Sequence, residues 1–541
     1  MKSTPSPPNP PLEGEGFRRC APERSYAHAT DSAGHSRTGQ RLSPSPSRGG
    51  LGWGWCCLAA SAVLGACSVG PDYARPELPV PEAYKEDAGW HPAEWKAAHP
   101  ADALDRGAWW EIFGDPLLND LEKQVDVSNQ TLKQAEAQYR QAAATVSAAR
   151  AGFFPTLAVS ASATRSGRYG DSASGSAGSS HPTNSFSLPF TASWEPDLWG
   201  RVRRTVEGDV ANAQASAATI ESTRLSVQAQ LAQTYFQLRI VDEQKRLLDD
   251  TVDAYARALK LTQNQYDVGV VARADVIQAD TQLKSAQVQA IDLGIARAQF
   301  EHAIALLIGK VPAQFALEPG LLQVKPPAIP VGVASTLLER RPDVAIAERQ
   351  AAAANAQIGV AEAAFFPNLT LSATAGFQSS SFSKWLTAPS RFWSLGPQLA
   401  ETIFSGGLRR AQVAQARAGW EAAVANYRLV SLAAFQNVED NLAALRILEA
   451  EAVAQDQAVQ AAQQGLAIAL NQYRAGTVSY LNVVTAQTTA YSNERNAITI
   501  LGNRLNDSVA LIKALGGGWS DSELPPASDI RTGDADAPSR D

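Results

Sequence analysis

The feature that most constrains the fold of this chain is an internal duplication. The segment from Ala151 reads AGFFPTLAVSAS, and the segment from Ala363 reads AAFFPNLTLSAT, 212 residues later and without a gap. Recurrence at a fixed spacing is typical of a duplicated structural unit. Three further pairs recur at nearly the same spacing: Ala135-Glu136 with Ala347-Glu348, Leu198-Trp199-Gly200 with Phe404-Ser405-Gly406, and the NQYxxG sequences at Asn264 and Asn471. We therefore expect two repeats of one helix–strand–strand–helix–helix unit.

In each repeat a helical pattern changes to a strand pattern at the tripeptide FFP. Proline disfavours helix at the residue before it, so it predicts a helix end. Helices are expected over 117–151 and 335–364, and each is followed by two runs of alternating apolar and polar residues, which predict a strand hairpin. Each chain therefore contributes four strands. The junction residues are Phe153, Phe154 and Pro155 in the first repeat and Phe365, Phe366 and Pro367 in the second.

Long helices follow each hairpin. The 60 residues between Gly208 and Gly269 contain no Gly or Pro, and their apolar residues recur in steps of three, four and seven, as in a coiled-coil seam. At 1.5 Å per residue this helix is about 90 Å long. Return helices are expected over 272–308 and, after a second long helix over 407–476, up to residue 515. These helices are too polar to cross a membrane. The seam residues are Ile220, Val227, Leu231, Leu238, Val241, Leu248, Val252, Tyr255 and Leu259.

The strands are long enough to cross a bilayer when tilted, at about ten residues each. Four strands cannot close a barrel, and an open edge in lipid leaves backbone groups unpaired at a cost of several kcal/mol each. Several copies must therefore share their strands. Two copies would give eight strands and a barrel filled by its own side chains, whereas three would give twelve and an open lumen. The alternative is a soluble α+β protein with two exposed hairpins.

The N-terminal region predicts export and a lipid anchor. Residues 51–67 read LGWGWCCLAASAVLGAC, an apolar segment preceded by arginines and followed by small residues, which is typical of a secretory signal. The ending LGAC resembles a bacterial lipobox, so we expect lipidation of Cys67; an ordinary signal peptide is the alternative. Residues 1–66 are then a signal peptide with an N-terminal extension from a misassigned translation start. The covalent lipid on Cys67 is the one cofactor expected.

The rest of the chain argues against catalysis. All four cysteines lie within the first 67 residues, so no thiol nucleophile or sulfur-ligated metal site is expected after Cys67. The six histidines are scattered, and no nucleophile, phosphate-binding or zinc-binding motif appears in its proper context. We therefore expect neither an enzyme nor a metal site. The net charge of −7 argues against nucleic acid as the partner.

Several motifs in a fixed order resemble one family. They are CSVGPDYARPELPVPEAY from Cys67, WWEIFGDPLLNDL from Trp109, WEPDLWGRVRR from Trp194, LLERRPDVAIAERQ from Leu337, and the paired FFP and NQYxxG elements. With these the chain resembles the TolC-like outer-membrane factor family, in particular the RND efflux system outer membrane lipoproteins of the NodT-like group. The resemblance implies a mixed α/β membrane protein: a homotrimeric, twelve-stranded transmembrane β-barrel, four strands per chain, continued by a periplasmic α-helical barrel of coiled-coil helices.

The resemblance also implies a domain plan. It comprises a lipidated equatorial segment over 67–112, the first repeat over 113–309, an equatorial linker over 310–334, the second repeat over 335–515 and a disordered tail over 516–541. The implied function is a passive exit duct for drugs and other small molecules, anchored by lipid in the bacterial outer membrane and extending into the periplasm. Its partners would be a periplasmic adaptor (membrane-fusion) protein and an inner-membrane RND pump. The alternatives are a duct for type I protein secretion and a structural coiled-coil envelope lipoprotein.

In that family, tyrosine and carboxylate groups near the turn between the long helix and its return helix constrict the pore, and adaptors dock on the turns. By position, the acidic ring is assigned to Asp275, because its repeat mate Asn482 is neutral. Arg273 is close enough in sequence to tether Asp275. The resemblance thus assigns the periplasmic gate to Tyr266, Arg273, Asp275, Tyr473, Asn482 and Thr485, and the adaptor-docking turns to Gly269 and Gly476.

Overall fold

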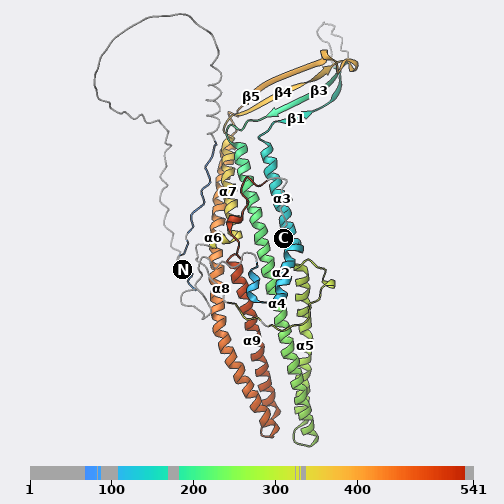
Figure 1. Cartoon of the computed structure of the whole chain (residues 1–541), viewed down its shortest axis with the longest axis vertical. Helices are drawn as coiled ribbons and strands as arrows, with labels where there is room; N and C mark the ends of the chain where they lie inside the picture. The colour runs from blue at the N-terminus through green and yellow to red at the C-terminus, as the bar shows by residue number, and fades with distance from the viewer. Residues whose placement is uncertain are drawn as a thin grey trace, which may run out of the picture. The chain divides into compact units, whose positions relative to one another are not determined.

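The computed structural model describes residues 68–78, 80–81, 83–86, 108–167, 182–322, 324–327, 329 and 337–530. All of them belong to one of the two units of the chain, Val63–Asp541. The predicted signal segment 1–66, the predicted lipidation site Cys67 and residues 531–541 lie outside the described residues. Figure 1 shows that the strands and the two helical hairpin tips lie at opposite ends of the long helices.

Two helices of equal length organise the fold. Helix α4 (Arg201–Asp267) and helix α8 (Leu408–Arg474) have 67 residues each, which corresponds to about 100 Å. The prediction that α4 begins after Gly208 is wrong, because Gly208 lies inside the helix. A Cβ at this position would lie 3.5 Å from both Ala353 O and Ala356 Cβ. Both are ordinary van der Waals distances, so the helix α7 (Pro342–Ala363) leaves room for a Cβ here. A single glycine lowers helix propensity by only about 1 kcal/mol, which the packing of α4 against its neighbours overrides.

Four shorter helices lie beside α4 and α8 in two end-to-end pairs. Helix α5 (Arg273–Leu307) ends where α3 (Gln130–Ala151) begins, and α9 (Tyr480–Ala514) ends where α7 begins. Asn129 Nδ2 donates to Leu307 O at 2.7 Å, and Arg341 Nη1 donates to Ala514 O at 3.0 Å. Helix α4 packs against all four, and α8 packs against α7 and α9. The helical layer therefore has α3 and α5 at one edge and α8 at the other.

Two predicted helices are each broken once. The helix expected over 117–151 is α2 (Pro116–Ser128) and α3, because Asn129 is extended and its side chain accepts from Leu132 N at 3.0 Å, which caps the second helix. The helix expected over 335–364 is α6 (Leu337–Arg340) and α7. Arg341 is extended because it precedes Pro342. Among the described helices, none combines the length and apolar character that a membrane-spanning helix needs.

One antiparallel sheet collects the strands of both repeats in the order β1-β3-β4-β5, with β2 also paired to β3. The strands are β1 (Thr156–Val159), β2 (Ser162–Ser166), β3 (Thr183–Trp194), β4 (Asn368–Ser379) and β5 (Arg391–Ala400). The predicted first strand is interrupted between β1 and β2, although both keep one register with β3. Pro189 of β3 lies opposite this gap, and a proline has no N–H to donate to the ladder.

The register gives the sheet one apolar and one polar face. Leu371 lies opposite both Trp194 and Pro397, and Ala375 lies opposite both Phe190 and Trp393. The alternate positions carry small polar residues, so that Thr374 lies opposite Thr191 and Ser394. The apolar face is uncovered by the described residues; Trp393, for example, is 79% exposed. Its exposed large side chains are Leu157, Val159, Phe190, Trp194, Trp393, Leu395 and Leu399.

Residues 68–75 form an N-terminal strap across both repeats. Val69 N donates to Trp199 O at 3.2 Å, and a Cβ on Gly70 would lie 2.4 Å from Gly359 Cα. The buried Arg204 forms an ion pair with Asp72 at 2.8 Å. Further contacts join Tyr73 Oη to Glu348 Oε1 at 2.6 Å and Arg75 Nε to Tyr427 Oη at 3.2 Å. The strap thus connects α4 of the first repeat to α7 and α8 of the second.

The prediction of a disordered tail from residue 516 is wrong for residues 516–530. Trp519 and Ile530 are buried, and Arg150 Nη1 donates to Ile530 O at 2.7 Å. The tail lies against α3 and α4 because its apolar side chains fill gaps beside Val146 and Ala218. The seam prediction for α4 is confirmed for six of its nine residues, which are buried: Val227, Leu231, Leu238, Val241, Leu248 and Tyr255. The other three, Ile220, Val252 and Leu259, are partly buried.

Candidate gate at the two hairpin tips

Each long helix ends in a turn built on one glycine. Gly269 and Gly476 have φ angles of 79° and 72°, in the left-handed region where glycine is favoured. Val270 N donates to Gln265 O and Thr477 N donates to Gln472 O, which is the hydrogen-bond pattern of a Schellman helix end. The prediction that these glycines make tight turns between antiparallel helices is confirmed.

The two tips pack on each other through a small buried cluster. Tyr473 is 2% exposed, and its hydroxyl donates to Thr262 Oγ1 on α4 at 2.9 Å. The ring of Tyr473 lies 5.5 Å from that of Tyr480, which is also buried. Ala258, Ala279 and Val483 complete the cluster. At the tips, the Tyr473–Thr262 hydrogen bond and this apolar cluster therefore connect the first helical hairpin to the second.

This geometry corrects the assignment of Tyr473 to the pore surface. A side chain that is 2% exposed within one copy of the chain does not face a lumen. Its repeat mate Tyr266 is 40% exposed and does lie on the surface. The two tyrosines therefore have different roles, although the sequence NQY around them is identical.

Asp275 occupies the third position of α5 and caps that helix. Its Oδ2 accepts from Ala272 N at 3.2 Å, and a carboxylate at a helix N-terminus is favoured by the helix dipole. The predicted tether from Arg273 is wrong: among the described residues, Asp275 forms no ion pair, and Arg273 is exposed at the first position of the helix. Asn482 and Thr485 are exposed, and Thr485 Oγ1 bonds to Leu481 O of its own helix at 3.0 Å.

Burial keeps the phenols of the cluster neutral. Desolvation raises the pKa of Tyr473, and the nearby carboxylate of Asp275 raises it further. Burial also raises the pKa of Tyr480 to about 12. The Tyr480 hydroxyl has no hydrogen-bond partner among the described residues. The tips thus meet through an uncharged core, and the carboxylate of Asp275, the one acidic residue predicted for the gate, lies near it.

The FFP junctions lie at the other end of the helices. Helices α3 and α7 end just before each FFP, and strands β1 and β4 begin just after it. The prediction that FFP marks the change from helix to strand is therefore confirmed. Trp199 stacks on Phe366 with ring centroids 4.8 Å apart, and its Nε1 donates to Pro367 O at 2.7 Å. In the second repeat the matching connection carries Phe404, which is 87% exposed, and Phe154 of the first junction is 70% exposed.

Sequence reasoning missed Thr262 and Tyr480. Thr262 falls in the polar part of α4, and its only sequence signal is its position one helical turn before Tyr266, the repeat mate of Tyr473. Tyr480 stands where the first repeat has Arg273, so comparison of the repeats hides it. Its signal would have been the apolar spacing from Tyr480 to Val483, which is typical of a buried helix face.

Two repeats, an amphipathic antiparallel sheet and long hairpins that meet at their tips together define a class, the two-repeat channels of the bacterial outer membrane. The sequence model described as outer membrane efflux protein matches residues 121–310 and 333–517. The chain belongs to the outer membrane efflux protein family.

Relatives and solved structures agree with this assignment. The probable efflux pump outer membrane protein TtgC and the antibiotic efflux pump outer membrane protein ArpC, both of Pseudomonas putida, are each 32% identical over 465 residues, which is 85% of this chain and 95% of each relative. The CmeC outer membrane channel of Campylobacter jejuni has a TM-score of 0.78 and 26% identity, covering 85% of this chain and 97% of its own. The protein is accordingly the outer-membrane component of an efflux pump, and it extends from the outer membrane into the periplasm.

Proposed function

We propose that three copies of this chain form one continuous duct, which serves as the passive exit of a tripartite RND-type efflux pump. The observation that carries the proposal is that the sheet and the helical layer each end in two unpaired edges. One edge belongs to the first repeat and the other to the second, in both layers. Edges of this kind favour a head-to-tail ring, in which the same contact repeats from copy to copy.

The sheet supports the proposal through its edges and its faces. Strands β1 and β2 form one edge and β5 forms the other. In lipid, an unpaired edge costs several kcal/mol for each backbone group without a partner, so β5 of one copy would pair with β1 and β2 of the next. The apolar face, with Trp393 and Leu395 exposed, suits lipid, and the polar face with Thr374 and Ser394 suits a lumen.

The helical layer supports the same ring. At one edge α5 exposes an apolar row, and at the other edge α8 exposes a second one, so that each row would cover the other in a ring. Burial of such side chains stabilises an interface by roughly 25 cal/mol per Å² of apolar surface. The exposed apolar residues are Ile277, Val288, Ile291 and Ile295 on α5, and Leu429, Leu432, Ile447 and Val453 on α8.

The duplication indicates how the contact between copies is made. Within one copy, the connection after β3 seats Trp199 on Phe366 of the next repeat. The matching connection after β5 carries Ile403 and Phe404, which are 98% and 87% exposed. Repetition of the internal contact would place this connection, in which Ser405 takes the position of Trp199, beside Phe154 of the neighbouring copy, which is also exposed. Internal and intermolecular joints would then alternate around the ring.

Three copies give twelve strands, which are enough for an open lumen, whereas eight strands enclose their own side chains. The duct would be passive, with the energy supplied by the inner-membrane RND pump. An adaptor would dock on the tip turns at Gly269 and Gly476, and a lipid on Cys67 would anchor each copy in the membrane. Relatives named for efflux of antibiotics favour small organic molecules as the exported class.

Conductance of the reconstituted protein tests this proposal. The purified, lipid-bearing protein is expected to run as a detergent-stable trimer and to conduct ions in planar bilayers. A structural envelope lipoprotein would instead give no conductance. A duct for type I protein secretion would also conduct, but deletion of the gene would then abolish export of a protein and leave drug susceptibility unchanged. Increased drug susceptibility of the deletion strain is the result the proposal requires.

A further inference from the structure

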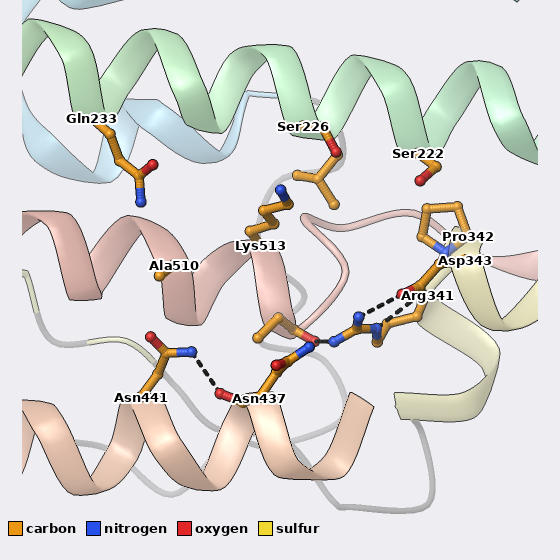
Figure 2. Close-up of a pocket in the computed structure, with 12 residues that line it drawn as sticks. Ser222, Ser226, Gln233, Arg341, Pro342, Asp343, Asn437, Asn441, Ala510 and Lys513 are labelled. Carbon is orange, nitrogen blue, oxygen red and sulfur yellow. Dashed lines mark hydrogen bonds and ion pairs between the residues drawn. The ribbon is translucent and has the colours of Figure 1, made fainter. Parts of the chain in front are cut away.

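A polar cavity lies where α9 ends and α7 begins, in the space between α4 and α8. It has a volume of about 310 Å³, and Figure 2 shows its lining side chains converging from all four helices. Ser222 and Ser226 come from α4, Asn437 and Asn441 from α8, and Lys513 from α9. The cavity is therefore formed mainly by hydrogen-bond donors, and none of the predicted gate residues lines it.

The charge in this cavity is positive and incompletely compensated. Lys513 extends from the last turn of α9 toward Ser226 (Figure 2), and its ammonium forms no ion pair or hydrogen bond with the described residues. Asp343 is the one carboxylate in the lining, and it is paired with Arg341, whose Nε donates to Asp343 Oδ1 at 2.9 Å. Arg341 also donates to Ala514 O. One cationic group thus remains available in each copy.

The cavity opens on the face of the helical layer opposite to the N-terminal segments. The backbone N–H groups of Lys85 and Glu86 bond to Glu439 on α8, and Trp109 Nε1 bonds to Gln228 on α4. At about 100° per residue, Glu439 and Gln228 lie roughly 200° around their helices from the cavity residues Asn437 and Ser226. The cavity therefore lies on the face that the described N-terminal segments leave uncovered.

We propose that this cavity binds the anionic group of a passing solute, a carboxylate or a phosphoryl group. The inference rests on the proposed function, because in the three-copy duct the uncovered face becomes the wall of the lumen. An ammonium group attracts both kinds of anion as a point charge, and hydrogen bonds between it and an anion are stronger than neutral ones. The hydroxyls of Ser222 and Ser226 and the amide of Asn437 supply additional donors around it. Three such sites would form a basic ring on the path of the exported molecule.

Titration calorimetry of the purified, detergent-solubilised full-length protein tests the site without requiring conductance. Inorganic phosphate and succinate are the two probes, which separate phosphoryl from carboxylate recognition. The variant is Lys513→Gln, and the matched control is Lys284→Gln on α5, a lysine that is exposed as Lys513 is. We expect saturable binding of at least one probe, an affinity at least tenfold lower in Lys513→Gln, and an unchanged affinity in the control.

Ser226→Ala is a second variant that retains the charge. It is expected to weaken binding several-fold, which a purely long-range effect of Lys513 would not explain. No saturable heat with either probe, or equal affinities in wild type and Lys513→Gln, would overturn the inference. The same protein samples would then be examined in planar bilayers. A wild-type protein that does not conduct contradicts the proposed duct, whereas a conducting protein that binds neither probe contradicts only the anion site.

Discussion

Replacing Tyr473 by Phe tests whether the tip cluster holds the duct closed. The substitution removes the hydroxyl that donates to Thr262 Oγ1 at 2.9 Å. Thr262 keeps its own bond to Ala258 O at 3.0 Å, so no buried donor loses its partner. The lost hydrogen bond contributes about 1 kcal/mol in each copy.

The expected effect on opening depends on how many copies move together. If each copy opens alone, about 1 kcal/mol shifts its open-to-closed ratio about fivefold. If all three copies open together, about 3 kcal/mol shifts the ratio roughly 160-fold. Thr262→Val is expected to have a larger effect, because it leaves the Tyr473 hydroxyl buried without a partner, at a cost of about 1–3 kcal/mol.

The assay is the fraction of time that single channels spend open in planar bilayers. The duplication supplies a matched control, Tyr266→Phe, because Tyr266 has the same sequence context and is exposed at 40%. We expect a higher open fraction for Tyr473→Phe and Thr262→Val, and an open fraction equal to that of the wild type for Tyr266→Phe. Equal effects of Tyr473→Phe and Tyr266→Phe, or none from either, would refute the claim that the buried Tyr473 holds the tips closed.

Three further predictions follow from buried or strained positions. Ala at Gly70 would place a Cβ 2.4 Å from Gly359 Cα, so Gly70→Ala should release the strap and speed proteolysis near residue 75; an unchanged cleavage rate would contradict the strap. Gly269→Ala, at a position where φ is 79°, should lower the stability of the fold by about 1–2 kcal/mol. Gly294→Ala, where an added Cβ on α5 meets nothing within 4 Å, should raise it by about 1 kcal/mol. Thermal denaturation of both variants checks this, and equal shifts of Tm would contradict the role of Gly269 in the turn. Burial, with a smaller effect of Asp126, raises the pKa of Glu122 well above its usual value. The folded protein therefore keeps a proton on Glu122 that the unfolded chain releases, and it loses about 1.4 kcal/mol of stability per pH unit as pH rises from the unfolded pKa to the folded one. Glu122→Gln should flatten the dependence of Tm on pH, and an unchanged slope would contradict this.

The sequence predicted the parts of the fold that depend on local chemistry. The helix ends at both FFP elements, the glycine turns at the tips and the apolar seam of α4 were all predictable, because each depends on residues close together in the chain. The duplication then predicted that the second half repeats the first. It also misled at one point, since equal motifs at Tyr266 and Tyr473 predicted equal roles.

The missed features depend on contacts between distant segments. The interruption between β1 and β2 depends on Pro189, which lies opposite it on another strand. The continuation of α4 through Gly208 depends on its packing against α7, and the order of residues 516–530 depends on gaps beside α3 and α4. The burial of Tyr473 depends on Thr262, 211 residues away in sequence. None of these pairs leaves a periodic signal in either segment alone.

Disulfide cross-linking between copies tests the ring most directly. Phe154 and Phe404 lie at opposite edges of one copy, and the chain contains no cysteine after residue 67. The double variant Phe154→Cys with Phe404→Cys is therefore expected, on oxidation in membranes, to give covalent dimers and trimers and to stop at three, whereas either single variant stays uncross-linked to its neighbours through this joint. A ladder that continues beyond three, or a double variant that remains monomeric under oxidation, would contradict the closed three-copy duct.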